Sequence, residues 1–443
     1  MAIHANFVFE VRTGGADTNG GGFKSTASGT DRTLQDAAHA TLSTSSVVHT
    51  TTTQINVAVG DYTVTSADVG NMLNLQGGSA TAGLYEITAA DTGNNRWTMD
   101  RAVGTAGQTC PGKMGGAYAT PGYAAKAMTV SGNLCWVKAG TYTITTSTAG
   151  AAGPVALVNS VQCAMIGYSS TRGDYAGRPE VNAGAVTGVV LIQHAATAPK
   201  QLLVHLRADG NTTSGVTGFE LADIEAFCID CEAEDCVLGF SGGGAGHVLA
   251  CGTINCTTST QQNTNVYGCQ MNKEGNLDNV TMDSYSYGGD GTIGSFNAYN
   301  CTHDGPTGAN GSCFGSQQAI DCIATNSAIR YGYNSAAVAY LEHCADYNNS
   351  LGRLSTTPLD KNVITLTTDP YVDSAGHDYR VNNSAGGGLL LKGLAVLIGD
   401  MADGRDVGAL QGADDSGHPA MRRHGLSRFG RPVAIGRKGE QVY

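Results

Sequence analysis

Ile320-Asp321-Cys322 and, 22 residues later, Glu342-His343-Cys344 show the short pattern that decides the fold. A mostly apolar residue is followed by Asp, Asn or His and then by cysteine. The pattern also occurs earlier in the chain, as Ile229-Asp230-Cys231, Ile254-Asn255-Cys256, Leu277-Asp278-Asn279 and Tyr299-Asn300-Cys301. Its third positions are 25, 23, 22, 21 and 22 residues apart. This spacing is typical of one coil of a parallel β-helix, whose equivalent residues stack about 4.8 Å apart.

The alternation of side chains along a strand predicts where these residues point. The first and third positions should face inward together, and the middle position should face outward. The third positions then form an inward structural ladder of small groups: Cys231, Cys256, Asn279, Cys301, Cys322 and Cys344. Asn326 and Asn348 each follow a cysteine by four residues, where a turn with positive φ suits asparagine.

The composition agrees with a β-rich chain that carries few charges. Of 443 residues, 14% are charged and 62 are glycine, against about 25% charged and about 7% glycine in ordinary proteins. We therefore expect an all-β fold in which a right-handed single-stranded parallel β-helix follows a small antiparallel β-domain. The expected domains are an attachment-like β-domain over 1–125, the β-helix over 126–411 and a basic tail over 412–443.

Residues 56–100 predict the antiparallel part of the first domain. Four runs alternate apolar and polar residues, and glycine-rich or asparagine-rich turns separate them: 61–65, 71–75, 84–88 and 96–99. A short helix is expected over Thr33–Leu42, and helices are otherwise almost absent.

The charge distribution bears on possible partners. The net charge is −12, but residues 421–443 carry six basic residues and one acidic residue, which leaves −17 on the rest. An acidic body does not bind nucleic acid through counterion release. Arg422, Arg423, Arg428 and Arg431 of the tail are candidates for contact with an acidic partner protein, and a solvated terminus is the alternative.

The first residues and the apolar stretches predict the cell compartment. Met1–Phe9 lacks the basic and apolar regions of a signal peptide. The longest apolar stretch, Gly388–Gly399, is too short to span a bilayer, so no membrane insertion is expected. We expect synthesis in a cytoplasm, where thirteen cysteines should stay reduced.

Three passages resemble a known class of proteins. Residues 6–23, NFVFEVRTGGADTNGGGF, are similar to the opening of virion structural proteins of tailed bacteriophages. The stretch from Asp68 to Gly104 resembles the small β-domain that follows that opening. Asp369-Pro370, Gly376–Val381 and Asp406–Gln411 resemble the closing coil of right-handed parallel β-helix proteins.

The resemblance implies a virion surface protein of the tail-fibre or tailspike-like type. Such a protein is expected to be a homotrimer in the virion, made in the host cytoplasm, with other virion proteins as partners and no cofactor. Its β-helix would display a surface for attachment to host polysaccharide. Two alternatives stay open, a capsid decoration or head-fibre protein with no receptor role, and a glycan depolymerase.

A depolymerase would need two carboxyl groups about 5–9 Å apart. Asp290, in a Gly-Gly-Asp-Gly run, and Asp304, before Gly305, are one coil apart and form the candidate catalytic pair. An outward column of Asp278, Asn300, Asp321 and His343 is a related arrangement. Because Asp-Gly is also a common turn dipeptide, the chain is more simply interpreted as having no enzymatic activity.

Two further groups of residues are candidates for binding. Tyr285, Tyr287, Tyr331 and Tyr333 are candidates for glycan or partner contact, since tyrosine stacks on sugars and also packs at interfaces and in cores. Cys228, Cys231 and Cys236 have a spacing that can bind zinc. The ladder already accounts for Cys231, so we expect buried thiols and no metal.

Overall fold

The computed structural model describes residues 5–158, 161–194, 200–223, 225–242, 246–261, 265–267, 269–271, 280–282, 285–287, 297–299, 301–305, 313–315, 318–327, 331–333, 340–351, 359–374 and 378–391. These residues form strands almost throughout, with one α-helix and two 3-10 helices among them. The expected all-β class is therefore confirmed. The chain divides into two compact units, Met1–Ala226 and Phe227–Tyr443.

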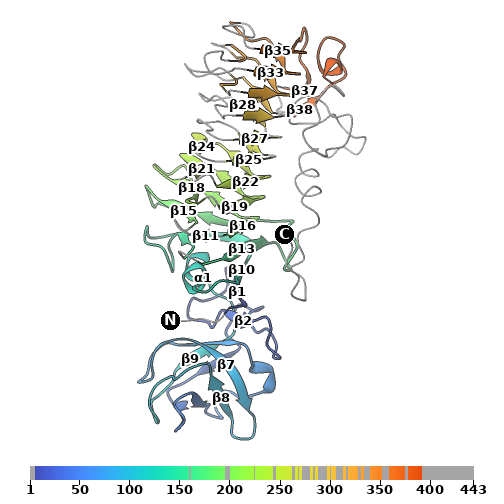
Figure 1. Cartoon of the computed structure of the whole chain (residues 1–443). Helices are drawn as coiled ribbons and strands as arrows, with labels where there is room; N and C mark the ends of the chain where they lie inside the picture. The colour runs from blue at the N-terminus through green and yellow to red at the C-terminus, as the bar shows by residue number, and fades with distance from the viewer. Residues whose placement is uncertain are drawn as a thin grey trace. The chain divides into compact units, whose positions relative to one another are not determined.

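The first unit contains a seven-stranded antiparallel sheet with the strand order β3-β9-β6-β7-β8-β5-β4 (Figure 1). Its elements are β3 (Ala40–Leu42), β4 (Val47–Val48), β5 (Gln54–Asn56), the 3-10 helix η1 (Ser66–Asp68), β6 (Met72–Leu75), β7 (Gly83–Asp91), β8 (Arg96–Met99) and β9 (Gly112–Met114). Trp97, Ile55 and Leu73 are fully buried in its core. Three of the four expected strands are present as β6, β7 and β8, whereas residues 61–65 form no strand.

The expected helix over Thr33–Leu42 is wrong, and the structure has a helix elsewhere. The amide groups and carbonyl oxygens of residues 32–39 bond to the segment 114–117, for example from the His39 amide to the Met114 carbonyl at 2.8 Å, so a helical ladder does not form. The helix α1 (Pro121–Ala127) begins after the N-cap Thr120, with proline in its first turn. The Asp17 carboxylate accepts from the Thr120 hydroxyl at 2.8 Å and thereby holds this cap.

The remaining strands of the first unit belong to three parallel sheets. The chain visits the three sheets in strict rotation from β10 to β24. The first sheet contains β1 (Phe7–Val11), β2 (Gly22–Lys24), β10 (Asn133–Lys138), β13 (Cys163–Tyr168) and β16 (Gln201–Val204). The second contains β11 (Gly140–Thr143), β14 (Pro179–Asn182) and β17 (Arg207–Asp209), and the third contains β12 (Val155–Ala156), β15 (Val190–Gln193) and β18 (Thr217–Leu221). Only β2 pairs antiparallel within the first of these sheets.

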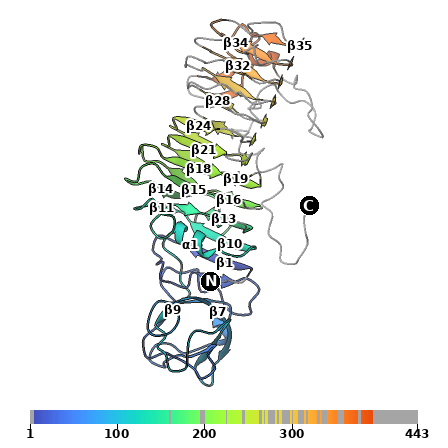
Figure 2. The ribbon, with the colours of Figure 1, turned by 60° about the vertical axis from the view of Figure 1, so that its left-hand side comes forward.

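The second unit continues the rotation to β24, after which its described parallel strands alternate between the first and second sheets, and Figure 2 shows β28, β32 and β34 in succession. Its first sheet contains β19 (Ala226–Ile229), β22 (His247–Leu249), β25 (Asn265–Tyr267), β27 (Val280–Met282), β29 (Asn297–Tyr299), β31 (Gln318–Ile320), β33 (Tyr340–Glu342) and β35 (Leu359–Lys361). Its second contains β20 (Glu232–Glu234), β23 (Gly252–Ile254), β26 (Gln270–Met271), β28 (Tyr285–Tyr287), β30 (Thr302–Asp304), β32 (Ile323–Thr325), β34 (Ala345–Tyr347) and β36 (Ile364–Thr365), and its third contains β21 (Leu238–Gly242) and β24 (Thr258–Gln261).

The cysteines of the described pattern are buried free thiols, but the predicted single ladder is wrong in one member. Ile229 pairs with Leu249, so the residue above Cys231 is Cys251, whose sulfur accepts from the Cys231 amide at 3.3 Å. Glu234 pairs with Ile254, which places Cys256 above Cys236 at the next corner. Cys301, Cys322 and Cys344 share one column as expected. Asn279 lies outside the described residues.

The backbone conformation of the middle residue explains why Asp, Asn or His occupies that position. At Asp230, Asp321 and His343 this residue forms the corner between the first and second sheets. Its backbone there is left-handed, with φ of 51°, 56° and 50°. Asn and Asp are the side chains that best tolerate this region. Asp321 is only 1% exposed, which corrects the expectation that it faces outward. Asn326 and Asn348 have φ of 55° and 51°, which confirms the turn predicted for them.

The last described residues of the second unit form an antiparallel pair rather than another coil. β37 (Tyr371–Asp373) pairs with β38 (Asp378–Val381), followed by the 3-10 helix η2 (Gly388–Leu390). Tyr371 and Leu391 pack with Ile323 and Leu366 in one buried cluster. Residues 406–411 and the basic tail with Arg422, Arg423, Arg428 and Arg431 lie outside the described residues.

Candidate functional site

An outward face of the second unit gathers aromatic and aliphatic side chains on its first parallel sheet. Along β19, Cys228 is fully buried, whereas Phe227 and Ile229 on either side of it are partly exposed. The same alternation recurs in the strands that follow. We call this surface the aromatic face and define it by the partly exposed residues Phe227, Ile229, His247, Leu249, Tyr267, Tyr299, Ile320 and Tyr340.

The rings on the aromatic face are stacked on one another. The centroids of Phe227 and His247 are 4.7 Å apart with an interplanar angle of 13°, and those of His247 and Tyr267 are 6.2 Å apart at 24°. The parallel register produces this arrangement, because Phe227 pairs directly with His247 one coil further on. The strands of the first sheet therefore present a column of nearly parallel rings.

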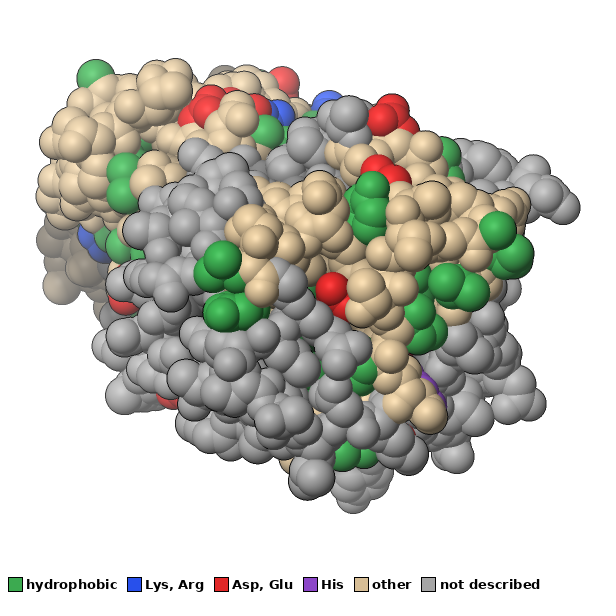
Figure 3. Space-filling view, turned by 90° about the horizontal axis from the view of Figure 1, so that it is seen from above, with side chains coloured by type: hydrophobic (Ala, Val, Ile, Leu, Met, Phe, Trp, Pro, Cys, Tyr) green, Lys and Arg blue, Asp and Glu red, His purple; other side chains and the backbone are tan. Residues whose placement is uncertain are grey.

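The chemistry of the aromatic face suits an uncharged ligand with both apolar and polar surfaces. Tyrosine offers an apolar ring and a polar hydroxyl group. A pyranose ring likewise has a C–H face and hydroxyl groups at its edge. Glu342, which follows on β33, accepts from the Tyr340 hydroxyl at 2.7 Å. Seen from above, the described residues of the molecule show mostly uncharged side chains, with a few acidic and fewer basic ones between them (Figure 3).

The tyrosines predicted as contact residues are placed differently from one another. Tyr333 is fully buried, and its ring stacks on Phe314 at 5.2 Å between centroids, so a surface contact by Tyr333 is wrong. Tyr331 is partly exposed. Tyr285 and Tyr287 lie in β28, and their side chains fall outside the described part of the structure.

The proposed catalytic pair receives no support from its described member. Asp304 is the last residue of β30 rather than a loop residue, and it is 8% exposed. Its Oδ1 accepts hydrogen bonds from the Thr325 hydroxyl at 2.5 Å and the Asn326 amide at 2.7 Å. A carboxylate bound in this way supports the fold and does not reach a polymeric substrate. Asp290 lies outside the described residues, as do Asp278 and Asn300.

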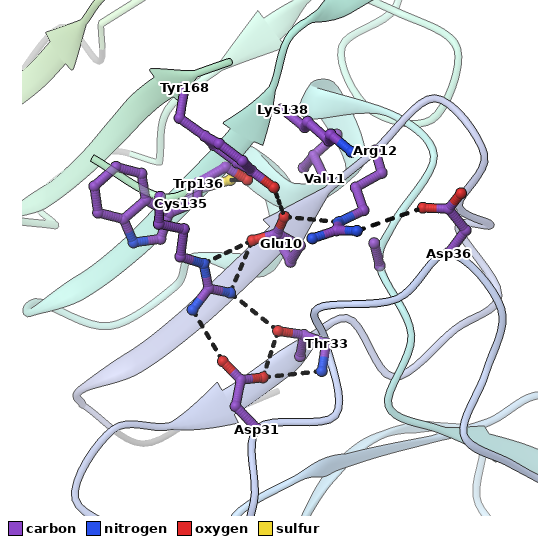
Figure 4. A network of polar contacts seen from close by, with 12 residues as sticks. Glu10, Val11, Arg12, Asp31, Thr33, Asp36, Cys135, Trp136, Lys138 and Tyr168 are labelled. Atoms are coloured by element: carbon purple, nitrogen blue, oxygen red, sulfur yellow. Dashed lines mark hydrogen bonds and ion pairs between the residues drawn. The ribbon is translucent and has the colours of Figure 1, made fainter. Parts of the chain in front are cut away.

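Figure 4 shows a buried acid–base cluster in the first unit. Glu10 on β1 is 0% exposed, and its carboxylate accepts from Arg12 Nε at 2.9 Å, from Arg172 Nε at 2.8 Å and from the Tyr168 hydroxyl. Arg172 also donates to Asp31 at 2.9 Å. Burial, followed by the hydrogen bond to Glu10, raises the pKa of Tyr168. The cluster joins β1, the segment around Asp31 and the β13–β14 loop, so its role is to position the N-terminal strand.

The cysteine side chains are buried, and burial raises the pKa of several thiols. Burial raises the pKa of Cys163 to about 12 and that of Cys110 to about 11, so both stay protonated at neutral pH. Burial also raises the pKa of Cys228, the first residue of the candidate zinc motif. Among the described residues, no group of three or more His, Cys, Asp or Glu side chains is arranged to hold a metal ion.

Comparisons with known proteins do not assign this chain to a family. No protein-family model matches it, and no curated protein matches it either. Within the described part of the chain, no helix has the length and apolar character needed to cross a membrane.

Proposed function

We propose that this protein is a surface component of a bacteriophage virion, in which a right-handed parallel β-helix presents the aromatic face to glycans of the host surface. Support for the β-helix comes from strands that visit three parallel sheets in rotation from β10 to β24, then alternate between two of them, and stack in register on their neighbours. Each coil then hydrogen-bonds its backbone to its neighbours and gives a stiff, extended binding surface.

The observation that carries the binding role is the stacked column of Phe227, His247 and Tyr267. Partly exposed rings of this kind cost free energy in water unless a ligand or partner covers them. The aromatic face as defined contains no Asp, Glu, Lys or Arg side chain, which favours a neutral polysaccharide over an ionic ligand. The passages similar to tailed-phage virion proteins supply the class of particle, made in the host cytoplasm and assembled with other virion proteins.

Binding to polysaccharide purified from the host surface tests the role of the aromatic face. Phe227→Ala and Tyr267→Ala should each weaken binding of the full chain about tenfold or more, because each removes one stacking surface. Ile254→Ala is the matched control, since Ile254 is 40% exposed in the same unit but lies on the second sheet. Equal binding by all three variants would exclude the aromatic face as the glycan site.

Antibody labelling of assembled particles tests the virion assignment separately. Label on the tail supports an attachment role, whereas label over the head supports the capsid-decoration alternative. Light scattering of the purified chain measures whether it is the homotrimer that the resemblance implies. Release of sugar fragments during the binding assay would instead indicate a depolymerase.

A further inference from the structure

Arg32, in the first unit, is a partly exposed arginine whose Nε atom is buried. Its backbone is fixed on both sides, since the Arg32 amide donates to Asn71 Oδ1 at 2.9 Å and the Arg32 carbonyl accepts from the Gly116 amide at 2.8 Å. Its side-chain Nε is buried, yet it has no hydrogen-bond acceptor among the described residues. A buried N–H group without an acceptor costs about 1–3 kcal/mol, which a bound anion would recover.

The Cβ atoms of His39 and Arg32 both lie beside Gly115. A Cβ atom built on Gly115 would lie 2.7 Å from the Arg32 Cβ and 3.2 Å from the His39 Cβ, so glycine lets the two side chains lie next to each other. The His39 ring packs edge-on against Tyr62, with 5.6 Å between centroids. His39 Nε2 lies 3.2 Å from the Tyr62 hydroxyl oxygen.

The Asp68 carboxylate, which accepts from Tyr62, has its hydrogen-bonding capacity met by other donors. Asp68 is fully buried, and its two oxygens accept from the Tyr62 hydroxyl, the Thr65 amide and hydroxyl and the Trp97 indole N–H, all at 2.8–3.0 Å. Because Tyr62 gives its proton to Asp68, its oxygen is free to accept from His39 Nε2–H. The chain Asp68–Tyr62–His39 therefore fixes the imidazole next to the unpaired guanidinium.

The electrostatic balance of this cluster selects the charge of its ligand. Burial, and then the charge of Arg32, lower the pKa of His39, so the imidazole is neutral at neutral pH. Arg32 is then the one positive charge of the cluster, and the neutral imidazole beside it adds no second positive charge. A carboxylate placed at the guanidinium therefore meets an attractive charge.

We infer that Arg32 forms a carboxylate-binding site on the antiparallel part of the first unit, with the neutral His39 ring packed beside it. The guanidinium group donates two parallel hydrogen bonds to one carboxylate, a geometry that lysine cannot supply. The carboxylate comes from an acidic side chain of a partner protein or from an acidic sugar. This inference is independent of the proposed function, because it involves neither the aromatic face nor a host glycan.

Titration of the full chain, with NMR detection of histidine side chains, tests the site. Sodium acetate should shift the His39 signal in a saturable way, because His39 lies beside Arg32. Acetyl-glutamate and glucuronate distinguish the two sources, since tighter binding of one or the other identifies a protein or a sugar acid.

Substitutions of arginine provide the controls. Arg32→Gln should weaken acetate binding at least tenfold, and Arg32→Lys should recover only part of it, since it keeps the charge and loses the two-pronged geometry. Arg96→Gln should bind as the parent does, because the Arg96 guanidinium already donates to Asn56 and Gln54. Unchanged fluorescence of Trp97 verifies folding of each variant. No saturable shift in the parent, or the same affinity in Arg32→Gln, would overturn the inference.

Discussion

Removal of the Arg172 side chain should destabilise the first coils by disrupting the cluster around Glu10. Arg172 Nε lies 2.8 Å from Glu10 Oε2, and the Glu10 side chain is 0% exposed. Breaking a buried ion pair from one side costs about 3–5 kcal/mol, because the remaining charge is left without compensation. Here Arg12 and Tyr168 still donate to the other Glu10 oxygen, so we expect about 2–3 kcal/mol for Arg172→Gln.

The fluorescence of Trp136 reports on this region directly. Trp136 pairs with Glu10 across the strands and lies 6.1 Å from the Tyr168 ring. Trp97→Phe removes the other tryptophan of the chain, so urea unfolding followed at Trp136 measures the stability of the first coils.

Two further variants separate the ion pair from a general loss of packing. In a double-mutant cycle, Glu10→Gln combined with Arg172→Gln should cost at least about 1 kcal/mol less than the sum of the single changes. Arg96→Gln, which loses hydrogen bonds to neutral side chains, should cost no more than about 1.5 kcal/mol. The reasoning is refuted if Arg172→Gln stays within about 0.5 kcal/mol of the parent, or if the two single changes are additive.

Three other substitutions test particular parts of the structure. Asn255→Val should lower the free energy of unfolding in urea by about 1–2 kcal/mol, because φ is 52° at this exposed residue. Asn255→Gly should leave that free energy nearly unchanged, and equal losses in the two variants would contradict the backbone explanation. Burial lowers the pKa of His303 to about 3, so its neutral ring supports stability above pH 6.5 and loses that contribution as the pH falls toward 3. His303→Phe should therefore flatten the decline of stability between these pH values, and an unchanged slope would show that other groups cause it. Asp304→Asn should lower the free energy of unfolding by about 1–3 kcal/mol and leave any glycan cleavage unchanged; loss of cleavage in a folded variant would restore Asp304 as a catalytic residue.

The sequence predicts the strand content and the buried thiols well because both follow from local rules. Alternation of apolar and polar residues identifies β6, β7 and β8 within three residues of their ends. The pairing register between successive strands of one sheet is harder to predict from the sequence. Cys231 is followed by Cys251 after 20 residues and then by Cys269 after 18, so coils shorter than the expected 22 residues were overlooked.

The polar clusters could not be predicted because their members are far apart in the chain. Glu10 and Arg172 are separated by 162 residues, and neither lies in a recognisable motif. Asp304 illustrates the opposite difficulty, since a turn dipeptide and a strand end have the same local sequence. Its burial depends on Thr325 and Asn326 of the next coil, which no local pattern around Asp304 reveals.

The sequence pattern does not predict the aromatic face, for a reason that concerns the corner residue. Alternation continued through the middle residue of the pattern places the first position inward with the cysteine, and so hides Ile229 from the surface. A left-handed residue instead turns the chain, so Ile229 before the corner and Cys231 after it belong to different sheets with separate inward and outward sides. Once the alternation is restarted at each corner, the partly exposed positions of the first sheet, two residues before each cysteine, become the outward column that includes Ile229, Leu249 and Tyr267. The same short pattern therefore specifies both the buried thiols and the surface on which we place glycan binding.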